Sequence, residues 1–204
     1  MRNKFYTLYG KRFFDLAAAI SGLIFLVPVL ASVALLIKII DGSPVFFVQK
    51  RVGRNFKIFN LVKFRSMAPG AETKGWIITA GDDPRVTRLG GFLRKTKMDE
   101  LPQVFNVLKG DMSFVGPRPE VEEYVNIFRR DYEEILKARP GITDYASVIF
   151  RDEENVLKCY NNPRKGYVED ILPQKIALYK QYLKEAGFLT DTRLIFLTLV
   201  KIAK

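Results

Sequence analysis

The sequence predicts a mostly helical α+β fold, in which a compact cytoplasmic domain with a small β-hairpin is seated on an N-terminal membrane helix. Three observations on the 204 residues support this fold class. Residues 16–37 contain no charged side chain. Two runs rich in Val, Phe and Ile, 45–49 and 57–63, lie on either side of Gly53, which is typical of a hairpin. Much of the remaining chain has apolar residues at helical spacing, bounded by Gly and Pro.

The uncharged run is long enough to cross a membrane, since a helix of this length extends roughly 33 Å. Pro28 lies near its middle, and an internal proline removes a hydrogen bond and kinks a helix. Basic residues mark the cytoplasmic side of a membrane segment, and here they flank both ends: Lys4, Lys11 and Arg12 before the run, Lys38, Lys50 and Arg51 after it. We therefore expect residues 1–40 to form a re-entrant helix and residues 41–204 a cytoplasmic domain. A straight span is the alternative, whereas the run is too long for a signal peptide.

Local signals divide the rest of the chain. Asp99 is an acceptable N-cap for a helix that Gly110 ends. The other expected elements are a turn at 41–44, a loop at 68–84 with the apolar island Trp76–Ile78, a short basic helix at 85–96, an irregular stretch at 111–119, and helices at 121–137, 171–186 and 192–202. The last of these is apolar enough to pack on the core or to lie in the membrane surface.

Composition limits the chemistry. The chain has no histidine and a single cysteine, Cys159, which excludes Ser-His-Asp and Cys-His catalysis and Cys/His zinc sites. Carboxylates, Lys, Tyr, Ser and Thr remain as reactive groups. The formal net charge of +11 arises entirely before residue 119. This excess suits an anionic lipid, a nucleic acid or a phosphate-rich small substrate.

Asp99 and Glu100 are adjacent carboxylates that follow a group of cations, Arg94, Lys95 and Lys97. Their position alone favours helix capping. A helix N-terminus also binds phosphate, however, and an aspartate whose pKa such cations lower stays ionised and can attack phosphorus. A neighbouring glutamate can hold a divalent cation. This pair is therefore the best candidate site that the residues themselves indicate.

Three further basic residues are candidates for binding phosphate. Arg118 stands between Pro117 and Pro119, so its guanidinium is held in place at low entropic cost. Lys63 and Arg65 end the second expected strand. For all three side chains a surface ion pair is the alternative interpretation.

Eight ordered stretches together resemble the bacterial sugar transferases, the monotopic phosphoglycosyl transferases of undecaprenyl-phosphate pathways, in their small form consisting of the catalytic core. The stretches are Lys11–Asp15, the apolar run with Pro28, Phe47–Gly53, Phe59–Met67, Asp83–Arg88, Leu93–Thr96, Asp99–Gln103 and Lys109–Pro119.

The resemblance implies that the protein transfers a sugar-1-phosphate from a UDP-sugar to undecaprenyl phosphate and releases UMP, the first membrane step of glycoconjugate assembly. In this family Asp99 corresponds to the nucleophile that forms a covalent phospho-sugar intermediate, and Glu100 to the ligand of Mg²⁺. Pro28 corresponds to the helix-breaking proline of the re-entrant element. The residues expected to contact phosphate or nucleotide are Arg94, Arg118, Lys63, Arg88 and Arg151. The active site would face the cytoplasm at the bacterial inner membrane.

The sequence departs from the family downstream of Thr143. Many members continue with Gly, a Gln-Val pair and Gly-Arg, whereas this chain has Asp144 and reaches Arg151 only after Ile149 and Phe150. The sugar accepted and the role of Arg151 are therefore open at this point. The expected partners are the UDP-sugar, undecaprenyl phosphate and membrane lipids, with a homodimer as a possible assembly. The alternatives are a membrane-tethered scaffold and a basic nucleic-acid-binding protein, although no nucleic-acid-binding pattern is present.

Overall fold

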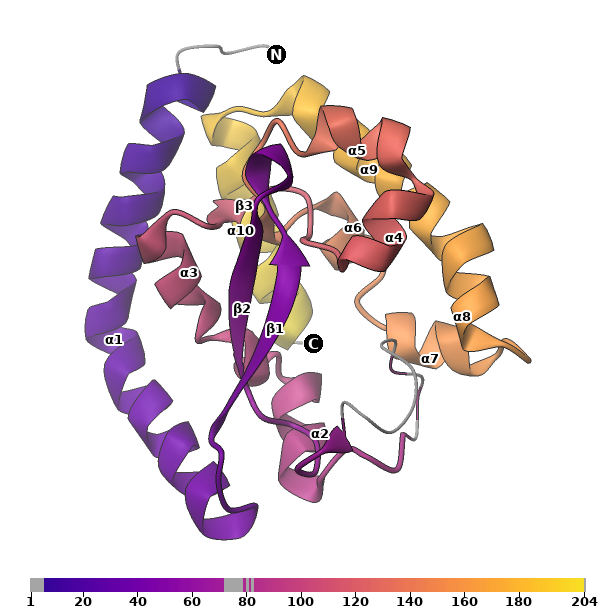
Figure 1. Cartoon of the computed structure of the whole chain (residues 1–204). Coiled ribbons are helices and arrows are strands. Elements are labelled where there is room, and N and C mark those ends of the chain that lie inside the picture. The colour runs from indigo at the N-terminus through magenta and orange to yellow at the C-terminus, as the bar shows by residue number, and fades with distance from the viewer. Residues whose placement is uncertain (1–5, 72–78, 80, 82, 204) are drawn as a thin grey trace.

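The computed structural model describes residues 6–71, 79, 81 and 83–203. A short π-helical turn, Tyr6–Gly10, leads into the long helix α1, Lys11–Ile40. Figure 1 shows α1 along one side of the molecule, a β-hairpin through the middle, and most other helices on the far side of the hairpin. The fold is mostly helical with one small antiparallel sheet, as predicted.

Helix α1 continues without interruption across Pro28. The hydroxyl of Ser32 donates a 2.9 Å hydrogen bond to the Pro28 carbonyl oxygen. Within the described residues, α1 is the helix long and apolar enough to cross a membrane. Its inner side packs on the domain through Ala19, Leu30, Val33 and Ile37. Its outer side leaves large apolar side chains exposed, among them Ile20, Ile24, Phe25, Val27, Leu35, Leu36, Ile39 and Ile40.

The predicted hairpin is confirmed. Strands β1, Phe46–Val52, and β2, Ile58–Phe64, pair antiparallel from Phe46↔Phe64 to Val52↔Ile58. A 3₁₀ turn, Arg54–Phe56, closes the hairpin. Phe59 and Leu61 of β2, two residues apart on one face, are buried against α1 and α3, and Phe64 at the end of β2 is buried against α1 and α2.

The expected basic helix is confirmed as α2, Arg88–Lys95. The hydroxyl of Thr87 caps it by accepting a 2.8 Å hydrogen bond from the Gly90 N–H. Gly90 weakens helix propensity, but a Cβ at this position would overlap the Ser66 carbonyl oxygen. The glycine is therefore needed where α2 crosses the end of the hairpin.

The expected N-cap at Asp99 is wrong. Asp99 lies inside a 3₁₀ turn, Met98–Glu100, that begins after Lys97 in the left-handed region at φ 57°. Helix α3 follows only at Gln103–Lys109. It ends at Gly110, φ 91°, as predicted. The carboxylate of Asp99 is thus turned into the protein and caps nothing.

The irregular stretch expected at 111–119 contains a strand. Strand β3, Ser113–Val115, pairs parallel with β4, Gly141–Thr143. Gly116 and Gly141 approach so closely that a Cβ on Gly141 would overlap the Gly116 backbone. The paired strands β3 and β4 place the Pro117–Pro119 loop beside the 144–151 segment, because each segment follows one of the two strands.

The C-terminal half is helical. The single helix expected at 121–137 is two helices, α4, Glu122–Ile127, and α5, Arg129–Ile135, because the backbone of Phe128 leaves the helical region at φ −108° and ψ 38°. The predicted helix at 171–186 is confirmed as α9, Leu172–Glu185. The remaining elements are α6, Tyr145–Ile149, α7, Glu153–Lys158, α8, Pro163–Gly166, a π turn, Tyr167–Ile171, and α10, Phe188–Ala203.

Helix α10 covers the predicted apolar segment at 192–202. Leu194 packs in the core with Val115 and Tyr182, whereas Phe196 and Leu199 are exposed. The apolar island Trp76–Ile78 lies outside the described residues.

Candidate active site

A cavity of about 680 Å³ opens between the hairpin, the turn after α2, α6, α7 and α10. Its size is within the range of small-molecule sites. Its charged lining includes six of the sequence-predicted residues: Lys63, Arg65, Arg94, Asp99, Glu100 and Arg118. Arg151 also lines the cavity, while its Nη2 donates to the Ile202 carbonyl oxygen at 3.4 Å. Arg88 is exposed at the start of α2 and does not line the cavity, and Pro28 lies in α1.

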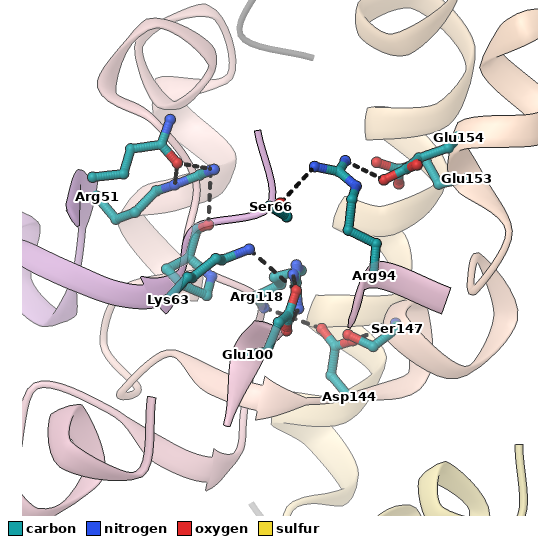
Figure 2. A network of polar contacts seen from close by, with 12 residues as sticks. Arg51, Lys63, Ser66, Arg94, Glu100, Arg118, Asp144, Ser147, Glu153 and Glu154 are labelled. Carbon is teal, nitrogen blue, oxygen red and sulfur yellow. Dashed lines mark hydrogen bonds and ion pairs between the residues drawn. The ribbon is translucent and has the colours of Figure 1, made fainter. Parts of the chain in front are cut away.

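The carboxylate of Glu100 is held by two cations from distant parts of the chain (Figure 2). Lys63 Nζ, from β2, donates to Oε1 at 3.1 Å. Arg118 donates through both terminal nitrogens, with Nη1 3.1 Å from Oε2 and Nη2 bonded to Oε1. Burial opposes ionisation of Glu100, but Arg118 and Lys63 outweigh it and hold the pKa of Glu100 well below its usual value. Glu100 is therefore ionised at neutral pH.

The pKa of Asp99 is shifted in the opposite direction to that of Glu100. Burial, together with the charge of Glu100, raises the pKa of Asp99 to about 6. The expectation that local cations lower this pKa is wrong, because burial and the charge of Glu100 outweigh the lowering effect of Lys63, Arg94 and Lys97. A carboxyl group with a pKa near 6 is still mostly ionised at pH 7. Its Oδ1 is buried and has no hydrogen-bond partner among the described residues.

Arg118 is fixed at both its backbone and its side chain. The Arg118 N–H donates to Asp144 Oδ2 at 3.1 Å, while Oδ1 of the same carboxylate accepts the Ser147 N–H at 2.6 Å and caps α6. Asp144 is fully buried. The sequence analysis identified this position as a departure from the family pattern but did not connect it to the site.

Arg94 reaches the cavity from α2. Its Nη2 forms an ion pair with Glu154 of α7, and its Nη1 contacts Ser66 Oγ at 3.4 Å (Figure 2). Its Nε is buried without a partner in the described part of the chain. Glu154 thus occupies one edge of a guanidinium that faces the cavity.

A second buried ionic cluster, missed by the sequence analysis, centres on Glu120. Arg51 Nη1 lies 3.3 Å from Glu120 Oε2, and Lys175 Nζ lies 3.8 Å from Oε1 and 2.9 Å from Glu153. Burial disfavours the charge of Glu120, but Lys175 and Arg51 outweigh it and lower its pKa. The sequence offered no signal beyond the Glu120 position next to Pro119, because its partners come from β1 and α9.

Buried polar atoms without partners are rare in folded proteins and often mark a ligand position. Among the described residues, nine such side-chain atoms occur, and five of them belong to residues that line this cavity. They are Nε and Nη1 of Arg65, Nε of Arg94, Oδ1 of Asp99 and Oγ of Ser147. The cavity therefore offers several cationic donors and one free carboxylate oxygen to an anionic ligand.

Comparison with known proteins identifies the family of this chain. The profile of the family described as bacterial sugar transferase matches residues 6–204. A Bacillus subtilis protein provisionally named as an undecaprenyl-phosphate N-acetylgalactosaminyl 1-phosphate transferase is 46% identical over 59% of this chain and 68% of its own length. The UDP-N-acetylgalactosamine-undecaprenyl-phosphate N-acetylgalactosaminephosphotransferase of Aeromonas hydrophila is 46% identical over 59% of this chain and 29% of its own.

The undecaprenyl-phosphate glucose phosphotransferase of Komagataeibacter xylinus is 37% identical over 93% of this chain. This match spans 35% of the relative's length. The chain thus corresponds to about a third of the Aeromonas and Komagataeibacter proteins and about two thirds of the Bacillus protein. Because the family profile covers nearly all of the sequence, the chain belongs to the bacterial sugar transferase family.

Proposed function

We propose that the protein transfers a sugar-1-phosphate from a UDP-sugar to undecaprenyl phosphate, giving an undecaprenyl-diphosphate-sugar and UMP. One observation carries the proposal: a buried aspartate with a free carboxylate oxygen, Asp99, adjoins a carboxylate clamped by Lys63 and Arg118, in a cavity lined by further arginines. The names of the relatives above supply the donor and acceptor classes. Family membership favours this enzyme over a scaffold or a nucleic-acid-binding protein.

In the donor step, Asp99 Oδ1 attacks the phosphorus next to the sugar. A new oxygen–phosphorus bond joins Asp99 to the sugar phosphate, and the bond to the bridging oxygen of the nucleotide breaks, so that UMP leaves with that electron pair. The elevated pKa of Asp99 makes its ionised form more basic than an exposed aspartate while leaving most of it deprotonated at pH 7.

The cations around Asp99 and Glu100 have two roles. Lys63 and Arg118 screen Glu100 from Asp99 and thereby keep two adjacent carboxylates ionised together. They also provide positive charge where a diphosphate would approach Asp99. Arg94 offers its free Nε to the same anion.

We propose that Mg²⁺ assists the donor step. No group of three or more His, Cys, Asp and Glu that could hold a metal occurs among the described residues, but Mg²⁺ in phosphoryl transfer is commonly held by one or two carboxylates together with substrate phosphates. Glu100, adjacent to Asp99, would hold it. When bound, the ion would neutralise charge on the diphosphate.

The membrane position follows from α1. Its outer apolar side chains are exposed over most of the helix length, while basic residues flank it at both ends. We infer that α1 is buried in the inner membrane of a bacterium and that the cavity faces the cytoplasm. A re-entrant path with Pro28 at its deepest part would require the helix, which is continuous across Pro28 in this structure, to bend there in the bilayer. This arrangement would bring a soluble donor and a lipid acceptor to the same cavity.

UMP release from UDP-sugars without acceptor tests the donor step. Asp99→Asn keeps the shape of the side chain but removes the nucleophile, so UMP release should be abolished for every UDP-sugar that the wild type accepts. Asp170→Asn is the matched control, because Asp170 is exposed and does not line the cavity. Normal UMP release by Asp99→Asn would overturn the assignment of the nucleophile.

A further inference from the structure

Arg65 is a buried arginine with three of its five N–H donors unpaired among the described residues. Its side chain is only 5% exposed. Nη2 donates to the carbonyl oxygens of Asp41 and Gly42, at 2.7 and 2.8 Å, just after the end of α1. Nε and Nη1 are buried and have no partner in the described part of the chain. A buried guanidinium with unpaired donors is costly, so an anion that accepts from them would be bound firmly.

The hairpin directs Arg65 toward the same side as the catalytic carboxylates. The Arg65 N–H donates to the Val45 carbonyl oxygen at 2.9 Å, which continues the antiparallel ladder one residue beyond Phe64. Side chains alternate along a strand, so Lys63 and Arg65 point to the same side with Cα atoms roughly 6–7 Å apart. Lys63 already contacts Glu100. Arg65 therefore provides the next cation along the strand, on the way to the end of α1.

The cavity wall at this end is apolar. Leu26 of α1, Phe46 of β1 and Phe64 of β2 line it together with Arg65. The Phe46 and Phe64 rings stack with centroids 5.4 Å apart. The cavity thus joins an unpaired cation to an apolar surface partly formed by the helix that we place in the membrane. A phosphate carried on a long apolar chain matches both features.

We propose that Arg65 binds the phosphate of the lipid acceptor through Nε and Nη1, while the apolar wall holds the first part of its hydrocarbon chain. This inference rests on the proposed function. An oxygen of the acceptor phosphate attacks the phosphorus carried by Asp99 and forms the new diphosphate bond. The bond between that phosphorus and the Asp99 oxygen breaks, and its electron pair restores the carboxylate. The charge of Arg65 reduces the repulsion between the two phosphates as they approach.

The donor's diphosphate is the other phosphate that Arg65 could bind, and two assays separate the sources. The full chain in detergent is first given a UDP-sugar alone, and the first turnover of UMP release is measured. Transfer is then measured against increasing undecaprenyl phosphate. Arg65→Gln should leave first-turnover UMP release within about twofold of wild type. It should raise the acceptor KM roughly ten- to a hundredfold, as expected for the net loss of one charge-assisted hydrogen bond when the glutamine amide still donates one of the two.

Arg65→Lys should restore part of the acceptor affinity, because it keeps the charge but loses the planar pair of donors. Arg130→Gln is the matched control, since Arg130 is exposed on α5 and outside this cavity. An unchanged acceptor KM in Arg65→Gln, or an equal loss of both half-reactions, would overturn the proposal. If the wild type itself releases no UMP, the proposed function fails instead.

A measurement on the wild type covers the case in which both variants unfold. Undecaprenyl phosphate should slow amide hydrogen exchange in residues 41–46 and 64–66, whereas UDP should not. Protection of these residues by UDP and not by the lipid would identify Arg65 as a donor-binding residue and overturn the proposal, as would no protection by either.

Discussion

Replacing Asp144 by alanine should both destabilise the protein and impair the donor step. Asp144 is fully buried, and its two oxygens accept the backbone N–H groups of Arg118 and Ser147. Alanine leaves both N–H groups without an acceptor. Losing the cap of α6 costs about 1 kcal/mol, and leaving the Arg118 N–H unsatisfied costs about 2 kcal/mol more. A loss of about 3 kcal/mol should lower the Tm by about 6–12 °C for a chain of this size.

The assay is thermal unfolding in one detergent, paired with UMP release at a temperature where both proteins are folded. Asp144→Asn should lie between wild type and alanine. The asparagine carbonyl oxygen replaces only one of the two acceptors, which destabilises the fold. Burial raises the pKa of Asp144, so the fold also disfavours its negative charge, and the neutral asparagine removes that part of the cost. The UMP release rate of folded Asp144→Ala should fall, because Arg118 then keeps only its side-chain contacts to Glu100. A Tm of Asp144→Ala within 1 °C of the wild-type value would refute the reasoning.

Three further outcomes are expected. Gly90→Ala should yield little folded protein, because the added Cβ would overlap the Ser66 backbone, and overpacking costs about 1–3 kcal/mol or more; Gly91→Ala, whose Cβ would lie 3.9 Å from Val86, is the control that should express and melt normally. Glu120→Gln should make the free energy of unfolding depend less on pH in the acid range. The lowered pKa of Glu120 means that its ionised form stabilises the fold above pH about 4.5 and that this contribution is lost as the pH falls. Denaturant titrations between pH 3.5 and 6 would show this, and an unchanged slope would contradict it. Glu154→Gln should lower the KM for the UDP-sugar about two- to fivefold, because it frees Arg94 from a half-exposed ion pair of small net energy; Glu123→Gln, which breaks the exposed pair with Arg164, should leave this KM unchanged.

Elements with local signals were predicted from the sequence, and those that depend on distant partners were not. The hairpin and α9 have apolar periodicity and turn residues within their own ranges. Strands β3 and β4 are three residues each, and each is a strand only because the other lies beside it. Phe128 has no helix-breaking chemistry, so the break between α4 and α5 could not be read from the sequence.

The same distinction applies to the site. Asp99 and Glu100 are neighbours in the chain, so their proximity was certain, and Lys63, Arg94 and Arg118 could be recognised as candidate cations. The burial of Asp99 is decided by tertiary packing and outweighs the nearby cations, which explains why the direction predicted for the Asp99 pKa was wrong. Glu120 binds partners from other elements, and Asp144, besides its local cap contact with Ser147, holds the Arg118 N–H of another segment; neither long-range contact gave a local signal.

The central claim is that Asp99 forms a bond to phosphorus. The most direct test is to mix the wild-type protein with a UDP-sugar in the absence of acceptor, stop the reaction within the first turnover, and determine the mass of the peptide that contains Asp99. That peptide should gain the mass of one sugar phosphate, and the added mass should disappear when undecaprenyl phosphate is supplied. Asp99→Asn should show neither the adduct nor UMP release. An adduct on any other residue, or UMP release by the wild type without an adduct, would contradict the account.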